Sequence, residues 1–64
     1  MIEEIINKVE NLQKEEIIVW FYDDFGNDDF TLINKDLLLE ALNGEKVLFA
    51  GGNVISIDDI FDVE

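Results

Sequence analysis

One segment constrains the fold of this chain more than any other. Residues 17–22 read Ile-Ile-Val-Trp-Phe-Tyr, and acidic pairs bound the run, Glu15 and Glu16 before it and Asp23 and Asp24 after it. A run of β-branched and aromatic residues of this length is typical of a β-strand. Because successive side chains of a strand point to opposite faces, both faces of this strand carry large apolar groups. The sequence therefore predicts a strand in a sheet that is covered on both sides.

Covering both faces is difficult for a chain of 64 residues, because a domain of this size buries only about 60% of the surface of its unfolded chain. Two short helices can bury the apolar side chains of one face of a sheet, but they bury those of both faces only incompletely. The second face is then closed by curling of the sheet into a barrel, by a second copy of the chain, or by another partner. We expect a homodimer, and the side chains predicted to form its interface are Ile18, Trp20, Tyr22 and Leu48.

Two segments carry the apolar spacing of amphipathic helices. In residues 2–14 the apolar side chains recur at i, i+3, i+4, i+7 and i+10, which places them in one stripe. The second helix begins after Asn34, a candidate N-cap, and Asn43-Gly44 supplies its C-terminal stop. Its expected apolar face consists of Leu37, Leu38, Ala41 and Leu42.

The remaining segments predict strands joined by tight turns. Residues 23–29 contain Gly-Asn turn chemistry and connect the first two strands as a hairpin, and Gly51-Gly52-Asn53 connects a second hairpin. The tail, residues 58–63, predicts a helical turn followed by a short edge strand. The expected fold is a single α+β domain over residues 1–64, in the order αββαββ, with an antiparallel four-stranded sheet. The strands after the first are predicted at 30–33, 46–50 and 54–57.

Residues 46–60 read Lys-Val-Leu-Phe-Ala-Gly-Gly-Asn-Val-Ile-Ser-Ile-Asp-Asp-Ile. This stretch resembles the closing hairpin and terminal turn of SH3-like small barrels. The resemblance implies a sheet that curls toward an SH3-like barrel.

The charge of the chain restricts its partners. Sixteen acidic residues against four lysines give a formal net charge of −12, which repels nucleic acid and anionic lipid alike. We therefore expect no direct binding to nucleic acid or to a membrane. Glu3 and Glu4 stand where a secretory signal would carry Lys or Arg, and no apolar run approaches the roughly 20 residues that span a bilayer. The expected compartment is the cytoplasm.

Catalysis is not expected from this set of residues. The chain contains neither His nor Cys, so Thr31 and Ser56 have no imidazole base and no thiolate site for a metal or cofactor exists. The loop at 23–29 fails the pattern of a calcium-binding EF-hand, because placing Gly26 at the sixth position puts Phe21 at the first. We expect a protein that binds and is not an enzyme, with no cofactor and no metal.

The acidity exceeds what solubility requires, since a small domain needs a net charge of magnitude about 2–8. Phe25 is an apolar residue within an acidic loop and is the candidate anchor for a partner. Size, acidity and composition resemble those of small phage proteins that disable host proteins. The sequence predicts a phage or mobile-element inhibitor that mimics duplex phosphates and blocks a basic surface of a host protein, often one that handles nucleic acid. The residues predicted to contact this partner are Glu15, Glu16, Asp23, Asp24, Phe25, Asp28, Asp29, Asp58, Asp59 and Asp62.

An alternative function uses the apolar surface alone. In this hypothesis the chain is a homo-oligomeric structural or adaptor domain, and its acidity serves only solubility. The two hypotheses differ in their response to salt, because charge mimicry weakens as ionic strength rises and an apolar interface persists.

Overall fold

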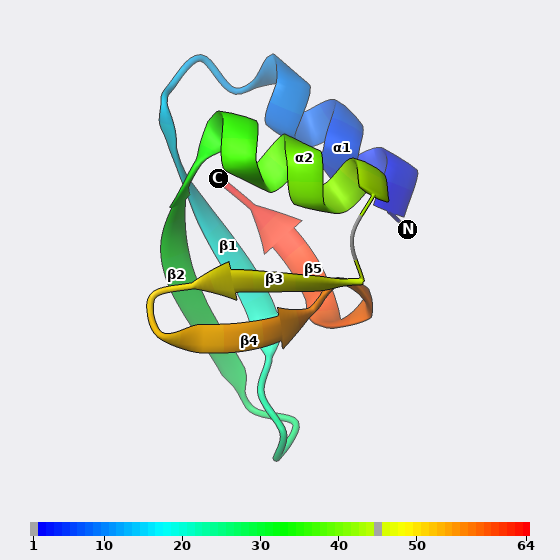
Figure 1. Ribbon diagram of the computed structural model, residues 1–64, viewed down its shortest axis with the longest axis vertical. Coiled ribbons are helices and arrows are strands. Elements are labelled where there is room, and N and C mark those ends of the chain that lie inside the picture. The colour runs from blue at the N-terminus through cyan, green and yellow to red at the C-terminus, as the bar shows by residue number, and fades with distance from the viewer. Residues whose placement is uncertain (1, 45) are drawn as a thin grey trace.

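The computed structural model describes residues 2–44 and 46–64. It is an α+β fold with two α-helices and five antiparallel strands (Figure 1). The elements are α1 (Ile2–Asn11), β1 (Glu16–Tyr22), β2 (Asp28–Asn34), α2 (Lys35–Gly44), β3 (Val47–Ala50), β4 (Asn53–Ser56), the single-turn 3₁₀-helix η1 (Ile57–Asp59) and β5 (Ile60–Val63). The helical turn and short edge strand predicted for the tail are therefore confirmed as η1 and β5.

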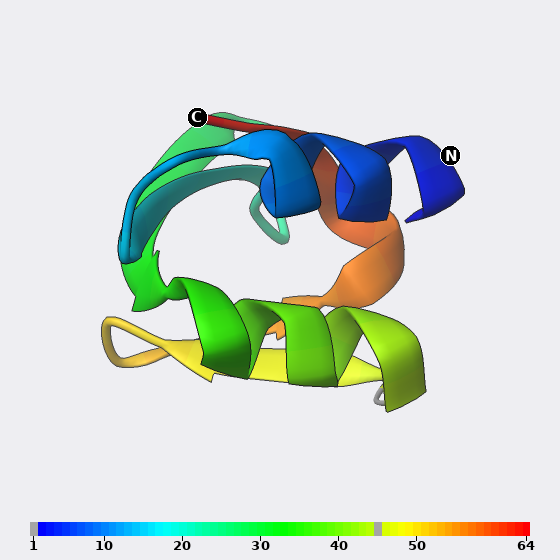
Figure 2. The ribbon, with the colours of Figure 1, turned by 90° about the horizontal axis from the view of Figure 1, so that it is seen from above.

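Strand β1 is the central strand of a three-stranded sheet with the order β2-β1-β5. Val19 lies opposite Thr31 of β2 on one edge and opposite Val63 of β5 on the other. Strands β3 and β4 pair with each other in a separate two-stranded sheet. Figure 2 shows the three-stranded sheet curving around one side of the molecule, with the β3–β4 hairpin on the opposite side.

This arrangement corrects the predicted four-stranded sheet. The strand that extends the first hairpin is β5, which occupies the free edge of β1, and not the second hairpin. Helix α2 intervenes between β2 and β3 in the chain, and the second hairpin crosses to the other side of the core (Figures 1 and 2). In the part of the chain that the structure describes, the two sheets do not join into a closed barrel, so the SH3-like barrel is not confirmed.

The core lies between the two sheets and extends beneath both helices. One face of β1 supplies Ile17, Val19 and Phe21, as the alternation of the strand predicts. Burying such side chains contributes about 1.5–3 kcal/mol each and accounts for much of the stability of the fold. The other buried apolar residues come from every remaining element: Ile5, Val9, Ile33, Leu38, Ala41, Leu42, Leu48, Ala50, Ile55, Ile57, Ile60 and Val63.

Polar contacts fix the start of helix α2 and the end of helix α1. Helix α2 begins where the sequence predicts, because the Oδ1 of Asn34 accepts hydrogen bonds from the backbone N–H groups of Asp36 (2.9 Å) and Leu37 (3.2 Å). Helix α1 ends three residues earlier than predicted. The Nζ of Lys35 donates to the carbonyl oxygens of Glu10 (3.3 Å) and Leu12 (2.8 Å), which satisfies backbone acceptors at the end of α1.

The turn between β3 and β4 generates a prediction about stability. Gly51 and Gly52 have φ angles of +57° and +77°, in the left-handed region that favours glycine. A Cβ atom on Gly51 would also overlap the hydroxyl of the buried Thr31, whereas a Cβ on Gly52 would meet nothing within 4 Å. We expect Gly52→Ala to lower the free energy of unfolding by about 1–2 kcal/mol, from backbone strain alone. Gly51→Ala should lower it further by about 1–3 kcal/mol, from overpacking.

Urea denaturation of both variants and the unchanged protein measures these differences. Gly52→Ala is the matched control, since it carries the same backbone strain without the steric overlap. Equal losses in the two variants would contradict the close packing of the turn against β2.

Candidate functional site

The outer side of the three-stranded sheet carries a continuous group of large apolar side chains. Ile18 lies opposite Leu32, and Trp20 lies opposite Phe30, and directly opposed residues of antiparallel strands point to the same face. We call this surface the aromatic face. Its six residues are Ile18, Trp20, Tyr22, Phe30, Leu32 and Phe61.

The rings of the aromatic face are held in two pairs. The centroids of Trp20 and Phe30 lie 5.1 Å apart at an interplanar angle of 42°. Tyr22 stacks on Phe61 with a centroid separation of 4.5 Å. The Nε1 of Trp20 donates a hydrogen bond to the Oε1 of Glu64 (3.2 Å). Because these contacts orient the rings before any partner arrives, binding on this face costs little further ordering of side chains.

Acidic residues border the aromatic face on all three strands, and we call them the acidic rim. Asp28 lies opposite Tyr22, and Asp62 lies opposite Trp20. Glu16 precedes the apolar rows of β1, and Glu64 follows β5. This surface therefore presents aromatic rings in the centre and carboxylates at the border. The members of the acidic rim are Glu16, Asp28, Asp62 and Glu64.

Two of the predicted acidic segments meet in space and form a second acidic area next to the aromatic face. Asp23 and Asp24 from the β1–β2 loop and Asp59 from η1 line one hollow of about 290 Å³, together with Tyr22 and Val54. The hollow has both polar and apolar walls, which suits a partner side chain that carries a long aliphatic stem and a cationic tip.

Asp23 has a structural role in the β1–β2 loop. Its Oδ1 accepts hydrogen bonds from the backbone N–H groups of Phe25 (2.9 Å) and Asn27 (2.8 Å), an Asx-turn arrangement that fixes the loop. Gly26 permits the turn with a φ of +79°. Phe25 consequently lies at the tip with 89% of its surface exposed, where the sequence predicts an anchor for a partner. Figure 1 shows this loop at the end of the molecule opposite the helices.

The structure separates some of the predicted site residues. Asp28 and Asp29 belong to β2 and not to the loop, because the strand begins two residues earlier than predicted. Asp58 lies on the other side of η1, in a hollow with Ile2 and Leu42. Glu15 is exposed just before β1. The ten predicted acidic and aromatic contacts therefore do not form one continuous surface.

The four residues predicted to form a dimer interface do not lie on one surface. Ile18, Trp20 and Tyr22 share the aromatic face, but Leu48 is only 3% exposed and belongs to the core. Strand β3 turns Leu48 inward and leaves Phe49 outward, which a run of apolar residues does not reveal. Sequence reasoning also missed Phe30, whose alternation with the buried Thr31 places it on the same side of the sheet as Trp20.

No family model matches the chain, and no curated protein or solved structure matches it. Across residues 2–44 and 46–64, no helix is long and apolar enough to cross a membrane. The same residues contain no group of three or more His, Cys, Asp or Glu side chains arranged to hold a metal ion.

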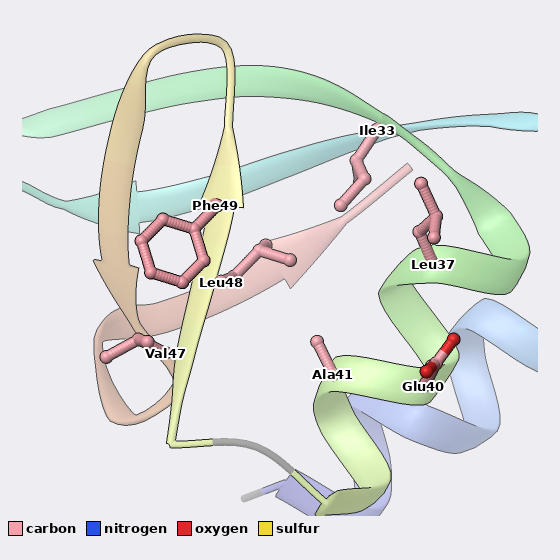
Figure 3. A pocket seen from close by; sticks show the side chains of 7 residues that line it. All are labelled: Ile33, Leu37, Glu40, Ala41, Val47, Leu48 and Phe49. Carbon is pink, nitrogen blue, oxygen red and sulfur yellow. The ribbon is translucent and has the colours of Figure 1, made fainter.

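A third surface feature lies away from the aromatic face, on the side of the second hairpin. An open groove of about 300 Å³ separates α2 from β3 (Figure 3). Leu37 and Phe49 stand at its border with 59% and 72% of their surfaces exposed. The groove is lined by Ile33, Leu37, Glu40, Ala41, Val47, Leu48 and Phe49.

An ion pair joins α1 to the acidic rim and generates a pH-dependent prediction. The Nζ of Lys8 lies 2.6 Å from the Oδ1 of Asp62. The hydrogen bond from Lys8 and a second one from the backbone N–H of Val63 lower the pKa of the Asp62 carboxyl below its ordinary value. A carboxyl with a lowered folded-state pKa stabilises the fold above its unfolded pKa, and this contribution is lost as pH falls through the folded-state pKa.

We expect Asp62→Asn to lower the free energy of unfolding at neutral pH by at most about 1 kcal/mol, because both partners are about half exposed. The difference from the unchanged protein should shrink to zero below the folded-state pKa, where Asp62 is protonated in both states. Thermal or urea unfolding followed from neutral to acidic pH measures this difference. Asp59→Asn is the control for the loss of one negative charge. A difference that persists in acid would show that Asp62 acts through packing and not through its charge.

Proposed function

We propose that this protein is a non-enzymatic binding module whose aromatic face and acidic rim occupy a basic surface of another protein. The observation that carries this proposal is the arrangement of six large apolar side chains on one exposed sheet face with a carboxylate border. Aromatic residues in the centre of an interface supply most of its binding energy. The carboxylates at the border attract a basic partner and reject an acidic one.

The chemistry of the face specifies the partner further. Arginine and lysine side chains bind favourably over the faces of Trp, Tyr and Phe rings, at about 0.5–2 kcal/mol for each contact. Trp20 and Phe30 present rings between the carboxylates of Asp28 and Glu64. A protein that binds nucleic acid carries such cationic side chains where phosphates normally lie. We therefore infer that the target is a nucleic-acid-handling protein, whose basic surface this module blocks.

The biological setting belongs to the same proposal. A net charge of −12 on 64 residues destabilises a compact chain by self-repulsion, so its retention suggests a use. Blocking a basic surface of a host protein in the cytoplasm is such a use, and it is the strategy of a phage or mobile-element inhibitor. Phe25 at the exposed loop tip supplies an additional apolar contact beside the hollow that contains Asp23, Asp24 and Asp59.

The alternative function is a homo-oligomeric structural or adaptor domain that uses the aromatic face as its interface. The position of Ile18, Trp20 and Tyr22 on one face favours it, since Tyr22 is exposed and the other two are only partly buried. Against it, two copies meeting through this face would place one acidic rim against the other, which costs free energy at low salt.

Neutralising three of the four carboxylates of the acidic rim tests the proposed function, and Asp62 is left intact because it forms the ion pair with Lys8. We expect the combined variant to lose the target protein in a tagged pull-down from nuclease-treated bacterial lysate, while its far-ultraviolet circular dichroism stays unchanged. Asp23 and Asp29 are left intact because their carboxylates accept backbone hydrogen bonds that hold the loop and the start of β2. The combined substitutions are Glu16→Gln, Asp28→Asn and Glu64→Gln.

The matched control removes the same charge from the exposed side of α1, with Glu3→Gln, Glu4→Gln and Glu10→Gln combined. This variant should retain the target, and the target should elute from the unchanged protein when the wash is raised from about 0.1 M to about 1 M salt, since screening then acts over about 3 Å. Retention by the rim variant, or equal loss from both variants, would exclude recognition through the acidic rim.

Truncating one ring tests the apolar part of the same surface. Phe30→Ala removes a half-exposed side chain that contacts Trp20, and we expect the dissociation constant for the captured protein to rise at least about tenfold. Isothermal titration calorimetry measures this change. Ile2→Ala, an exposed apolar residue on α1, should leave the dissociation constant unchanged. Recovery of the bait alone, as a salt-resistant oligomer that Phe30→Ala dissociates, would favour the structural alternative.

A further inference from the structure

The groove between α2 and β3 is almost entirely apolar, so it does not contribute to recognition of a basic partner. Of the described residues that line it, Glu40 alone is charged, and the remainder are aliphatic or aromatic. It lies on the side of the second hairpin (Figure 3). The aromatic face lies on the outer side of the three-stranded sheet, and Figure 2 shows that sheet on the opposite side of the molecule from the hairpin. On a molecule with a net charge of −12, two like-charged copies repel each other less at an apolar groove with one carboxylate than at the aromatic face with its acidic rim.

A protruding ring stands directly beside this groove. Phe49 is 72% exposed, and its cross-strand neighbour Val54 is also exposed on the same outer side of the hairpin. Figure 3 shows the ring of Phe49 at the border of the groove, with Leu37 on the opposite wall. The volume of about 300 Å³ lies at the lower end of the range for pockets that enclose a ligand, so one aromatic side chain is a suitable occupant.

We propose that two copies of this chain form a two-fold dimer in which Phe49 of each copy enters the groove of the other. A two-fold interface requires a self-complementary surface, in which a residue contacts its partner's hollow and receives the same contact in return. A knob and a hollow that adjoin on one monomer satisfy this requirement. The dimer also removes Phe49 and Leu37 from water, which a small domain with limited burial needs.

The dimer would make binding to the proposed target bivalent. This part of the inference rests on the proposed function. Because the groove lies on the side of the second hairpin, association through it leaves both aromatic faces exposed. A dimer with two free binding faces engages a target with two basic sites more tightly than a monomer does, through the effective concentration of the second face.

Sedimentation equilibrium of the purified protein tests the dimer without any partner. We expect a dimer whose dissociation constant stays constant or falls when salt rises from about 0.1 M to about 1 M, because screening reduces the repulsion between the copies. Phe49→Ala should raise the dissociation constant at least about 30-fold, as for a central interface residue. Leu37→Asp, on the opposite wall of the groove, should do the same. Both positions are exposed, and thermal unfolding of each variant verifies the fold.

Phe30→Ala is the matched control, since it truncates a ring of the aromatic face and should leave the dimer intact. A protein that is monomeric at every concentration would overturn the inference, as would a dimer that Phe30→Ala dissociates and Phe49→Ala does not. A small apolar molecule that copurifies with a monomer, detected by native mass spectrometry, would also overturn it. Capture of the basic target by the monomeric Phe49→Ala variant is measured separately, so the failure of either proposal is distinguishable from the failure of the other.

Discussion

Strand β1 pairs with a neighbour along both edges, and the rest of the molecule depends on this double pairing. One register places Val19 between Thr31 and Val63 inside the core. The same register places Trp20 beside Phe30 on the outer surface. The core and the proposed binding surface are therefore opposite faces of one strand. A slip by a single residue would exchange the two, so the pairing that stabilises the fold also specifies the surface.

Local patterns in the sequence predict the elements well because their causes are local. The alternation within β1, the Asn34 cap and the Gly51-Gly52 turn each depend on a few neighbouring residues, and the structure confirms them. The second neighbour of β1, strand β5, could not be predicted in the same way. The β1–β5 pairing joins residues as far apart as Val19 and Val63, and no short pattern encodes that contact.

In the candidate site, too, local patterns predict some features and long-range contacts decide the others. That Ile18, Trp20 and Tyr22 share a side follows from the period of a strand. That this side is the outer one depends on which side the core occupies, and the strand alone does not indicate that. For β3 every residue is apolar, so the sequence does not indicate that Leu48 points inward and Phe49 outward. The end of α1 depends on the side chain of Lys35, which reaches it from the start of α2. Long-range contacts of this kind explain why the predicted interface includes a core residue.

The pairing of β5 with β1 also has a consequence for how the protein is made. Trp20 and Glu64 are separated by 44 residues, and a fold that depends on such distant contacts completes slowly compared with one built from local contacts. During synthesis β1 and β2 leave the ribosome well before β5 exists, so the edge of β1 that β5 later covers is unpaired and both faces of the hairpin lie in water. Unpaired edges invite association with other chains, and the acidic pairs that flank β1 supply charge repulsion that opposes it during that interval. The acidic pairs beside β1 thus oppose association of the nascent chain through the same charge that they carry on the folded one.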